Sequence, residues 1–356
     1  MSKLQNLLKS IGDKADGFLI SSEHNQLYLT NFSYSDGYVL ITRTKSYLIT
    51  DFRYIEAAKK EADKKFEIIA LSGSRNSTLQ TLFNENNVKK LMFEDTVVSY
   101  SQYASLKKSF PNIELIPAGN IIENLRETKT DIEAEYITKA QRIAEKSLEM
   151  LLSDFDKNVT ERELASYLEY LMKKNGSEDI SFKTIAVSGK ASSLPHGVPR
   201  NQKLENGFLT IDFGAVYKGY RSDMTRTFCI GKADDEMKKV YSTVLNAQNS
   251  AIDAIMNGER NCKKIDKIAR DIIYNNGYEN CFGHGLGHGV GIEIHENPRL
   301  SPNVNCDCML KFGNIVTVEP GIYIENKYGV RIEDMIYLGN STPINLTKMP
   351  KNLIEL

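Results

Sequence analysis

The chain has 356 residues, which is more than one hydrophobic core usually serves, so we expect two domains. Its composition is 41% hydrophobic and 26% charged, and a formal net charge of −1 excludes a global field that would attract nucleic acid or an anionic membrane. The N-terminal residues lack an apolar core of signal-peptide length, and no stretch approaches the roughly 20 apolar residues of a membrane span. We therefore expect a cytoplasmic protein.

The cysteines agree with this expectation. There are five of them, an odd number in a long chain, and they do not form the pattern of a disulfide framework. Cys306 and Cys308 form a C-x-C without a second pair. We interpret them as ordinary thiols rather than metal ligands.

Residues 1–124 alternate strand-like and helix-like segments, which predicts an α/β domain. The strand-like segments are rich in branched and aromatic residues, and residues 52–65 between them are rich in Ala, Glu and Lys, as helices are. This region has one histidine, His24, and no acid cluster with ligand-like spacing, so we expect no chemistry in it. The predicted strands are 17–21, 38–50, 66–71, 89–95 and 113–118.

Residues 125–356 form the second predicted domain, which opens with a helix-start signal. Thr130 is followed three residues later by Glu133, the pattern of a capping box. Apolar residues at helical spacing follow, and further helices are expected at 160–174, 234–256 and 263–276. Strands are predicted between them at 183–189, 207–217, 225–231, 291–295, 314–320 and 329–338.

The histidines are concentrated in this second domain. Three of the five, His284, His288 and His295, fall in FGHGLGHGVGIEIHE, where five glycines interrupt any helix. We therefore expect a loop that runs into the strand GIEIH, in which Glu293 and His295 share one face. Three histidines within twelve residues, embedded in glycine, indicate a functional site rather than isolated structural histidines.

Four acids fall in two similar patterns. Asp212 ends an apolar run, FLTIDFG, and Asp223 opens another eleven residues later, so a hairpin would bring both carboxylates together. In the same way Glu319 ends IVTVEPG, a Pro-Gly turn region follows, and Glu333 lies in GVRIEDM. Each pair therefore predicts a strand–turn–strand unit that carries two carboxylates.

Buried carboxylates require a cationic partner, because an isolated buried charge is strongly unfavourable. Arg331, two residues before Glu333 and expected on the same strand face, could offset one acid. The basic residues nearby are too few for four acids, so a pair of divalent cations fits better. Carboxylates with one imidazole suit Mn(II), Co(II) or Zn(II), whereas the histidine disfavours calcium and the lack of thiolates argues against a structural zinc cluster.

With these residues in place, the sequence resembles the pita-bread metallopeptidases, and specifically the Xaa-Pro peptidases, prolidase and aminopeptidase P. The resemblance covers essentially the whole chain and implies a creatinase/prolidase-type α/β N-terminal domain, an α+β pita-bread catalytic domain and a homodimer. Order and spacing match in SSLPHGVP (192–199), TIDFGAVYKGYRSDMTRTF (210–228), GHGLGHGVGIEIHE (283–296), TVEPGIYI (317–324) and GVRIEDM (329–335).

The resemblance implies five metal ligands and a division of labour among them. Asp212 is similar to the acid that chelates one metal, and Asp223 to a bridging ligand. His288, rather than His284, matches the imidazole ligand. Glu319 completes the shell of the first metal, and Glu333 bridges to the other. The implied metal ligands are Asp212, Asp223, His288, Glu319 and Glu333.

Further site residues follow from the same resemblance. His196 and His295 match histidines that line the substrate pocket, and His284 matches one that stands behind the ligands. Arg331 matches an arginine that steadies the bridging acids. Arg299 falls where some prolidases have an arginine that faces the substrate carboxylate.

The implied reaction is hydrolysis of the peptide bond before proline in small peptides, with two divalent ions, manganese first and cobalt or zinc as alternatives. The cations share a water and lower its pKa, so that a bridging hydroxide is available near neutral pH. Glu319 then shuttles the proton, while His295 and His196 hydrogen-bond the developing oxyanion and the peptide. Because proline's nitrogen carries no hydrogen, selection falls to a pocket shaped for the pyrrolidine ring.

Three alternatives remain open besides the choice between dipeptidase and aminopeptidase. A methionine aminopeptidase shares the fold, but residues 1–124 and His284 argue against it. Creatinase works without metals and lacks the ligand set. A non-catalytic peptide-binding relative would be expected to have lost ligands, whereas this sequence retains all five.

Overall fold

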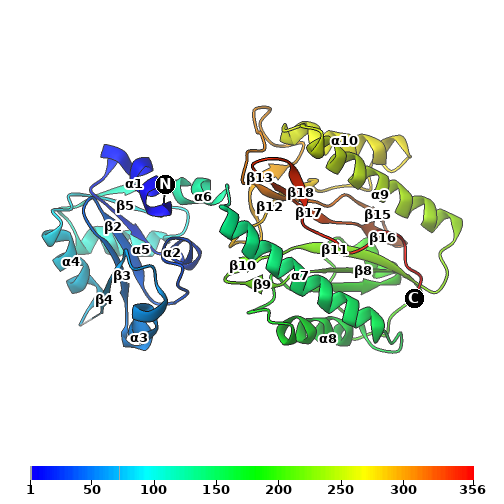
Figure 1. Ribbon diagram of the computed structural model, residues 1–356, viewed down its shortest axis with the longest axis horizontal. Coiled ribbons are helices and arrows are strands. Elements are labelled where there is room, and N and C mark those ends of the chain that lie inside the picture. Colours follow the sequence, from blue (N-terminus) through cyan, green and yellow to red (C-terminus); the bar gives the residue numbers. More distant parts are fainter. Residues whose placement is uncertain (1, 72) are drawn as a thin grey trace. The chain divides into compact units, whose positions relative to one another are not determined.

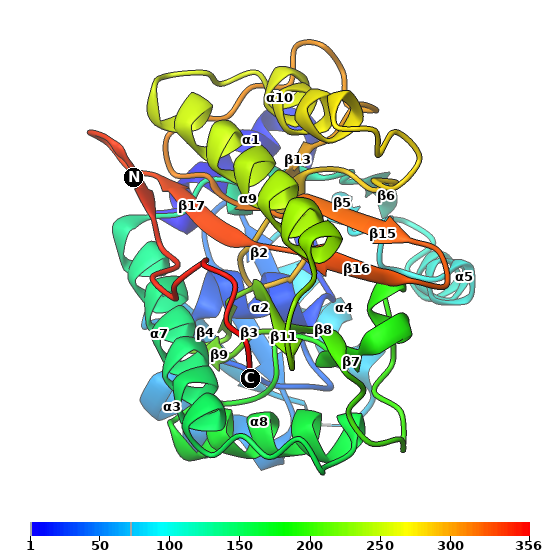
Figure 2. The same cartoon turned by 90° about the vertical axis from the view of Figure 1, so that its right-hand side faces the viewer.

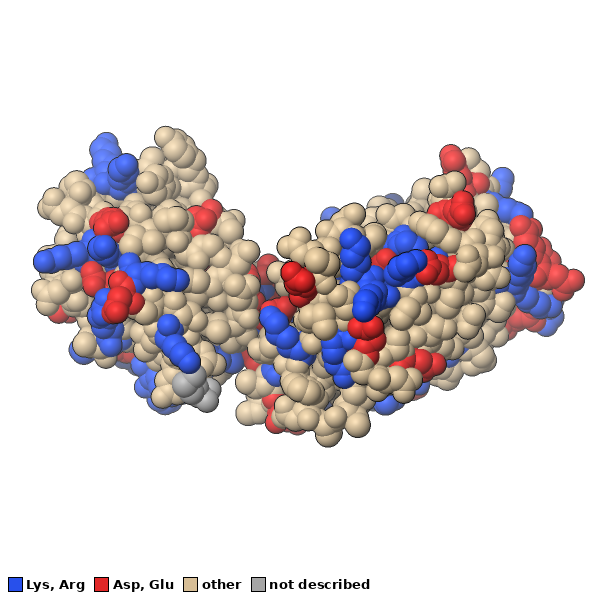
Figure 3. All heavy atoms as spheres, turned by 90° about the horizontal axis from the view of Figure 1, so that it is seen from above, with Lys and Arg blue, Asp and Glu red and all other residues tan. Residues whose placement is uncertain are grey.

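The structure, a computed structural model, describes residues 2–71 and 73–356 (Figure 1). It divides into two compact units, Met1–Arg126 and Glu127–Leu356, whereas the sequence places the boundary after residue 124. In the described part of the chain, no helix has both the length and the apolar character needed to cross a membrane. On the face shown in Figure 3, basic and acidic side chains are interspersed in both units, in keeping with a net charge near zero.

The first unit is built on one six-stranded sheet in the order β4-β3-β2-β1-β5-β6. The predicted strands are confirmed, and the long run 38–50 divides into an antiparallel hairpin, β2 and β3. The pairs β1/β5, β5/β6 and β3/β4 are parallel. The strand bounds are β1 Gly17–Ile20, β2 Tyr38–Thr42, β3 Ser46–Thr50, β4 Glu67–Ala70, β5 Lys90–Phe93 and β6 Glu114–Pro117.

The helices of this unit begin where short polar residues cap them. A serine or aspartate side chain accepts a hydrogen bond from the first turn of each of α1 to α5, which satisfies one otherwise unpaired backbone N–H. The predicted helix at 52–65 is confirmed but ends earlier, at Glu61. The bounds are α1 Lys3–Ile11, α2 Glu23–Thr30, α3 Phe52–Glu61, α4 Arg75–Glu85, α5 Tyr100–Ser109 and α6 Ile121–Arg126.

The four helices predicted in the second unit are all confirmed. The first begins at the predicted capping box, in which the backbone N–H of Thr130 donates to Glu133 Oε2 at 2.8 Å. In Figures 1 and 2, α9 and α10 cover one side of the strands, and α7 and α8 cover the other. A separate apolar cluster forms under each helix pair. The bounds are α7 Asp131–Ser153, α8 Glu161–Lys174, α9 Asp235–Met256 and α10 Cys262–Asn275.

The strands of the second unit form two main antiparallel sheets, β11-β8-β7 and β13-β12-β14-β17-β18. Two small hairpins, β9/β10 and β15/β16, stand between the long strands. The bounds are β7 Ile185–Ser188, β8 Gly207–Phe213, β9 Val216–Tyr217, β10 Tyr220–Arg221, β11 Met224–Ile230, β12 Gly287–Gly289, β13 Glu296–Leu300, β14 Ile315–Val318, β15 Gly321–Ile324, β16 Tyr328–Arg331, β17 Asp334–Leu338 and β18 Pro343–Asn345.

The predicted strand at 291–295 is wrong, and the predicted runs 207–217 and 329–338 each divide into two strands. Residues 291–295 form a series of bends, and β13 begins only at Glu296, because Arg221 binds the carbonyls of Gly291 and Ile292. The run 329–338 divides into β16 and β17, because the backbone of Glu333 turns away to bond Thr225 on β11. Residues 291–295 and 329–338 alternate like strands, but hydrogen bonds to residues distant in sequence hold their backbones.

The side chain of Arg226 connects β11 to β17 and to the C-terminal segment. It lies on β11 with 2% of its surface exposed. Its guanidinium donates to one buried carboxylate, Asp334 Oδ1, at 2.8 Å and to four backbone carbonyls. These carbonyls belong to Thr225 (2.9 Å), Glu333 (2.6 Å), Met349 (2.7 Å) and Pro350 (3.0 Å). β11, β17 and the C-terminal segment are therefore joined by a fully hydrogen-bonded buried cation.

We predict that Arg226→Met lowers the free energy of unfolding by about 2–4 kcal/mol, because it removes hydrogen bonds to four carbonyls and one of the two cations that pair with Asp334, the other being Lys351 at 3.1 Å. Urea unfolding followed by circular dichroism measures the change. Arg43→Met is the matched control, since Arg43 pairs with Asp13 at the surface and its removal should matter much less. Equal losses in both variants would contradict the structural role of Arg226.

Candidate metal centre

A cavity of about 1030 Å³ opens in the second unit, and every site residue predicted from the sequence lines it. Its volume suits a small peptide. The predicted residues around it are His196, Asp212, Asp223, His284, His288, His295, Arg299, Glu319, Arg331 and Glu333.

The two long antiparallel strand pairs bring the four acids to this cavity, and the predicted pairing of these strands is confirmed. Asp212 on β8 lies opposite Thr225 on β11, and Asp223 directly precedes that strand. Val318 at the end of β14 pairs with Asp334 at the start of β17, so Glu319 and Glu333 flank the last ladder pair. In each case a small hairpin, β9/β10 or β15/β16, replaces a tight turn.

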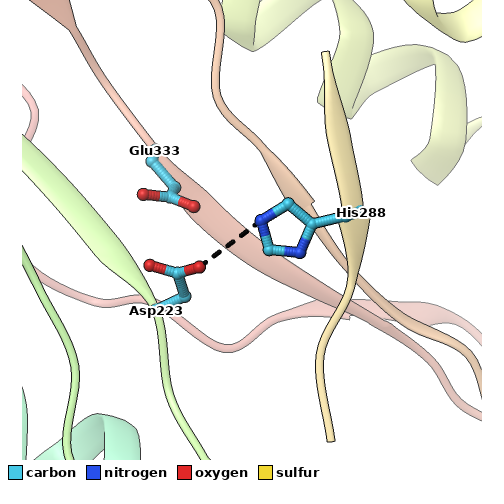
Figure 4. Close-up of side chains that lie close together, drawn as sticks. All are labelled: Asp223, His288 and Glu333. Atoms are coloured by element: carbon cyan, nitrogen blue, oxygen red, sulfur yellow. Dashed lines mark ion pairs between the residues drawn. The ribbon is translucent and has the colours of Figure 1, made fainter. Parts of the chain in front are cut away.

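Three side chains meet closely enough to share one metal ion (Figure 4). One ligand atom from each of Asp223, His288 and Glu333 lies within 4.8 Å of the other two. The imidazole Nε2 of His288 is 3.6 Å from Asp223 Oδ2 and 3.3 Å from Glu319 Oε1. Because its Nδ1 lies 3.1 Å from the carbonyl of Gly289 and donates to it, Nε2 keeps a lone pair that points toward the acids.

His284 is used differently from His288. Its Nδ1 donates to the Gly285 carbonyl at 2.8 Å, and its Nε2 accepts from the hydroxyl of Tyr323 at 2.9 Å. Burial lowers the pKa of His284, so the ring is neutral. Both ring nitrogens are therefore occupied by hydrogen bonds, and the imidazole is not free to bind a metal.

Arg331 contacts a different acid from the one that the sequence suggests. It forms an ion pair with Asp212 Oδ2 at 2.8 Å, and it ends β16 rather than sharing a strand face with Glu333. Its Nε donates to Thr225 Oγ1 at 3.1 Å, and that hydroxyl donates to Glu333 Oε2 at 2.7 Å. Arg331 is therefore linked to Glu333 by hydrogen bonds that pass through Thr225.

The acids strongly disfavour each other's ionisation. Burial and repulsion from Glu333 raise the pKa of Asp223 well above its ordinary value. Burial and repulsion from Glu319 do the same to the pKa of Glu333, and burial raises the pKa of Asp212 despite Arg331. Burial also opposes ionisation of Glu319, but its contact with the His288 imidazole at 3.3 Å outweighs burial and lowers the pKa of Glu319 to about 2. Ionising the whole cluster requires additional positive charge.

The donor atoms fit divalent cations. Asp212 Oδ1 and Glu333 Oε1 are buried and have no hydrogen-bond partner among the described residues. A buried acceptor left in this way costs about 1–3 kcal/mol, more if charged, and a cation would supply the missing interaction. Carboxylate oxygens with one imidazole nitrogen suit Mn(II), Co(II) or Zn(II).

The remaining predicted residues lie around this cluster. The ring of His295 is 4.5 Å from that of His288, edge to face. Burial, with the nearby His288 ring and the Arg299 guanidinium, lowers the pKa of His295 to about 4, so a neutral ring faces the cavity. Arg299 lies opposite His288 in the β12/β13 register, and His196 lines the cavity next to Pro195.

Three hydroxyl groups that support the cluster were not identified from the sequence. Thr225 bridges Arg331 and Glu333, and Tyr323 accepts from Arg331 Nη1 at 2.8 Å. Thr317 donates to Glu319 Oε1 at 3.1 Å and accepts from the backbone N–H of His288 at 3.0 Å. All three lie within two to four residues of a predicted ligand, which is the one signal that could have found them.

Comparison with known proteins agrees with this geometry. Residues 135–340 match the model of metallopeptidase family M24, and residues 1–128 match the creatinase/prolidase N-terminal domain. The chain belongs to metallopeptidase family M24. The predicted family and the two-domain fold class, a creatinase/prolidase-type domain followed by a pita-bread domain, are therefore confirmed, and the chain is a metallopeptidase.

Named relatives match almost the whole chain. An Xaa-Pro dipeptidase of Pyrococcus horikoshii is 37% identical over 341 residues, which cover 95% of this chain and 94% of the relative. The solved structure of an Xaa-Pro dipeptidase from Bacillus anthracis superposes with a TM-score of 0.93 at 39% identity, covering 99% of both chains. An X-Pro aminopeptidase from Thermotoga maritima gives 0.90 at 36% identity, covering 96% of this chain and 98% of that one.

We predict that Glu333→Ala weakens Mn²⁺ binding by more than about 100-fold, because losing even a partner of a metal ligand costs about 10–100-fold. Isothermal titration calorimetry of the chelated protein measures the change. Glu325→Ala removes an exposed acid from the β15/β16 turn and should bind Mn²⁺ as the wild type does. Wild-type affinity in the Glu333 variant would remove this residue from the metal centre.

Proposed function

We propose that this metallopeptidase hydrolyses the peptide bond before proline in small peptides, using two divalent cations. The observation that carries this proposal is the convergence of four acids and one imidazole in the cavity, with two buried carboxylate oxygens that lack partners. Relatives that act on Xaa-Pro bonds match the chain from end to end. The ligands that we assign are Asp212, Asp223, His288, Glu319 and Glu333.

The contacts and the family resemblance together suggest the ligand roles. Asp223, His288 and Glu333 would hold one cation together, and the resemblance implies that the two acids also serve the second. Asp212, which Arg331 orients through one oxygen, keeps its other oxygen for chelation. Bound cations would lower the pKa of a water and polarise the scissile carbonyl. We propose Mn²⁺ as the ion, with Co²⁺ or Zn²⁺ as substitutes, because these donors accept all three.

The surrounding side chains transfer protons and bind the peptide. Glu319 is the carboxylate beside the His288 imidazole, held by the hydroxyl of Thr317, and it takes the proton of the attacking water and passes it to the proline nitrogen. His295 is neutral and donates a hydrogen bond to the developing oxyanion, while His196 contacts the peptide.

The cavity walls supply the selection for proline. An imide nitrogen has no hydrogen to donate, so the ring must be recognised by shape. Apolar side chains line the cavity beside the acids, as such a ring requires: Phe182, Ile185, Pro195, Ile294 and Val304. Arg299 in the same lining is placed to bind the carboxylate of a dipeptide. We further propose a cytoplasmic homodimer, on the family resemblance.

We predict that the chelated enzyme resupplied with Mn²⁺ cleaves Gly-Pro at least about 10-fold faster than Gly-Ala in kcat/KM, since the pocket must read the ring by shape. Free glycine, which both dipeptides release, is measured by mass spectrometry and reports the rate, and Co²⁺ and Zn²⁺ are compared. A preference for Met-Ala-Ser over both dipeptides would instead favour a methionine-aminopeptidase-like activity.

Arg299→Ala should raise KM for Gly-Pro by about 10–100-fold, the value of one charge-assisted hydrogen bond, and affect Gly-Pro-Ala less. In the longer peptide the carboxylate lies farther from the scissile bond. Steady-state kinetics on both peptides provide the comparison. An equal loss on both would remove Arg299 from carboxylate recognition.

A further inference from the structure

We propose that Arg221 is a positioning residue that sets the separation of two walls of the cavity and thereby its fit to proline. This inference rests on the proposed function. Arg221 ends β10, two residues before Asp223, and it does not itself line the cavity. Its backbone and side chain together hold two segments that do.

The first wall is residues 182–185. The chain enters it through Ile180 and Ser181, whose carbonyls both accept from Arg221 Nη1. The backbone N–H of Ser181 donates to the Gly214 carbonyl at 2.8 Å, which anchors the same segment to the end of β8. Phe182 and Ile185, two of the apolar side chains that face the cavity, follow directly.

The second wall is residues 291–295, which end in Ile294 and His295. The backbone N–H of Arg221 donates to the Gly291 carbonyl at 2.8 Å, and Nε donates to the Ile292 carbonyl at 2.9 Å. Since this segment belongs to no strand, these bonds replace those of a sheet. The same guanidinium therefore contacts the second wall and the two residues that lead into the first.

A buried ion pair anchors the far end of the second wall. Lys129 Nζ is 2.7 Å from Glu296 Oε2, with only 2% and 7% of the two side chains exposed. A Cβ at Gly291 would lie 2.3 Å from the same Glu296 oxygen, so the carboxylate packs directly on the start of the segment. The Glu296 carboxylate also accepts from the backbone N–H of Glu293 at 3.2 Å, so it holds the segment from one side, while Arg221 connects the segment to the residues that lead into the first wall.

The side-chain chemistry explains why arginine serves here. A guanidinium is planar and presents donors in different directions, so Nε can hold one wall while Nη1 holds the other. A lysine ammonium is a single point of charge and would bind one set of carbonyls at the expense of the other. A neutral methionine would bind neither.

The test compares Arg221→Met and Arg221→Lys with the wild type. We expect Arg221→Met to raise KM for Gly-Pro about 10-fold, leave kcat within about 3-fold, and lower the Gly-Pro over Gly-Ala preference about 10-fold, the scale of a pocket-fit effect. The KM and the Gly-Pro preference of Arg221→Lys should lie between those of Arg221→Met and those of the wild type. Mn²⁺ affinity, measured by calorimetry, should stay unchanged, because the metal ligands keep their own contacts.

A second measurement does not depend on turnover. Hydrogen exchange followed by mass spectrometry should show faster exchange in residues 182–185 and in 291–295 of Arg221→Met. The matched control is Arg260→Met: Arg260 also donates to backbone carbonyls, those of Ile255 at 2.6 Å and Glu259 at 2.8 Å, but these do not line the cavity. Arg260→Met should leave the exchange rates of both segments and the substrate preference unchanged.

Three outcomes would overturn the proposal. Exchange that rises in one segment only, or in neither, would show that Arg221 does not join the walls. An unchanged Gly-Pro preference together with a lower melting temperature would leave it a purely structural residue. A parallel loss of kcat and Mn²⁺ affinity would place its effect on Asp223. By contrast, a wild-type enzyme without proline preference overturns the proposed function, while the exchange data still decide whether Arg221 joins the walls.

Discussion

Mutual repulsion among four carboxylates, of which Asp223 and Glu333 are buried and Asp212 and Glu319 partly buried, is the constraint on which this structure depends. Of the four, Asp212 has an arginine partner at 2.8 Å, and Asp223 and Glu333 have strongly raised pKa values because burial and neighbouring acids oppose their ionisation. Such an arrangement is unfavourable in the protein alone and becomes favourable when divalent cations take up the charge. The site is therefore organised for metal, in agreement with the M24 family to which the chain belongs.

The fold accommodates this constraint by using the same arrangement of strands twice. Each pair of acids lies at the end of two long antiparallel strands, with a small hairpin inserted where a turn would otherwise stand. Behind the strands, the buried guanidinium of Arg226 satisfies the carbonyls at the junction of β11 and β17. Rigid strands hold the ligands, and hydroxyl groups such as that of Thr225 orient them. Both features suit a preorganised metal site.

Metal chemistry and substrate choice are assigned to different parts of the cavity. The four acids that we propose as ligands lie at or beside strand ends, whereas most of the apolar side chains, and His295, come from irregular segments beside them. Related proteins named dipeptidase and aminopeptidase share the fold with this chain. Differences between such activities would then arise in the walls, where Arg299 and the contacts of Arg221 lie, rather than in the acids and the imidazole.

The sequence by itself determined the helices with their capping signals, most strands, the family and the ligand candidates, because these depend on local spacing and residue type. Only the tertiary structure decided which histidine keeps a free nitrogen, since Tyr323 occupies Nε2 of His284. It also decided that Arg331 pairs with Asp212 and that residues 291–295 leave the strand pattern. In each case the deciding hydrogen-bond partner lies far away in the chain, where periodicity carries no information.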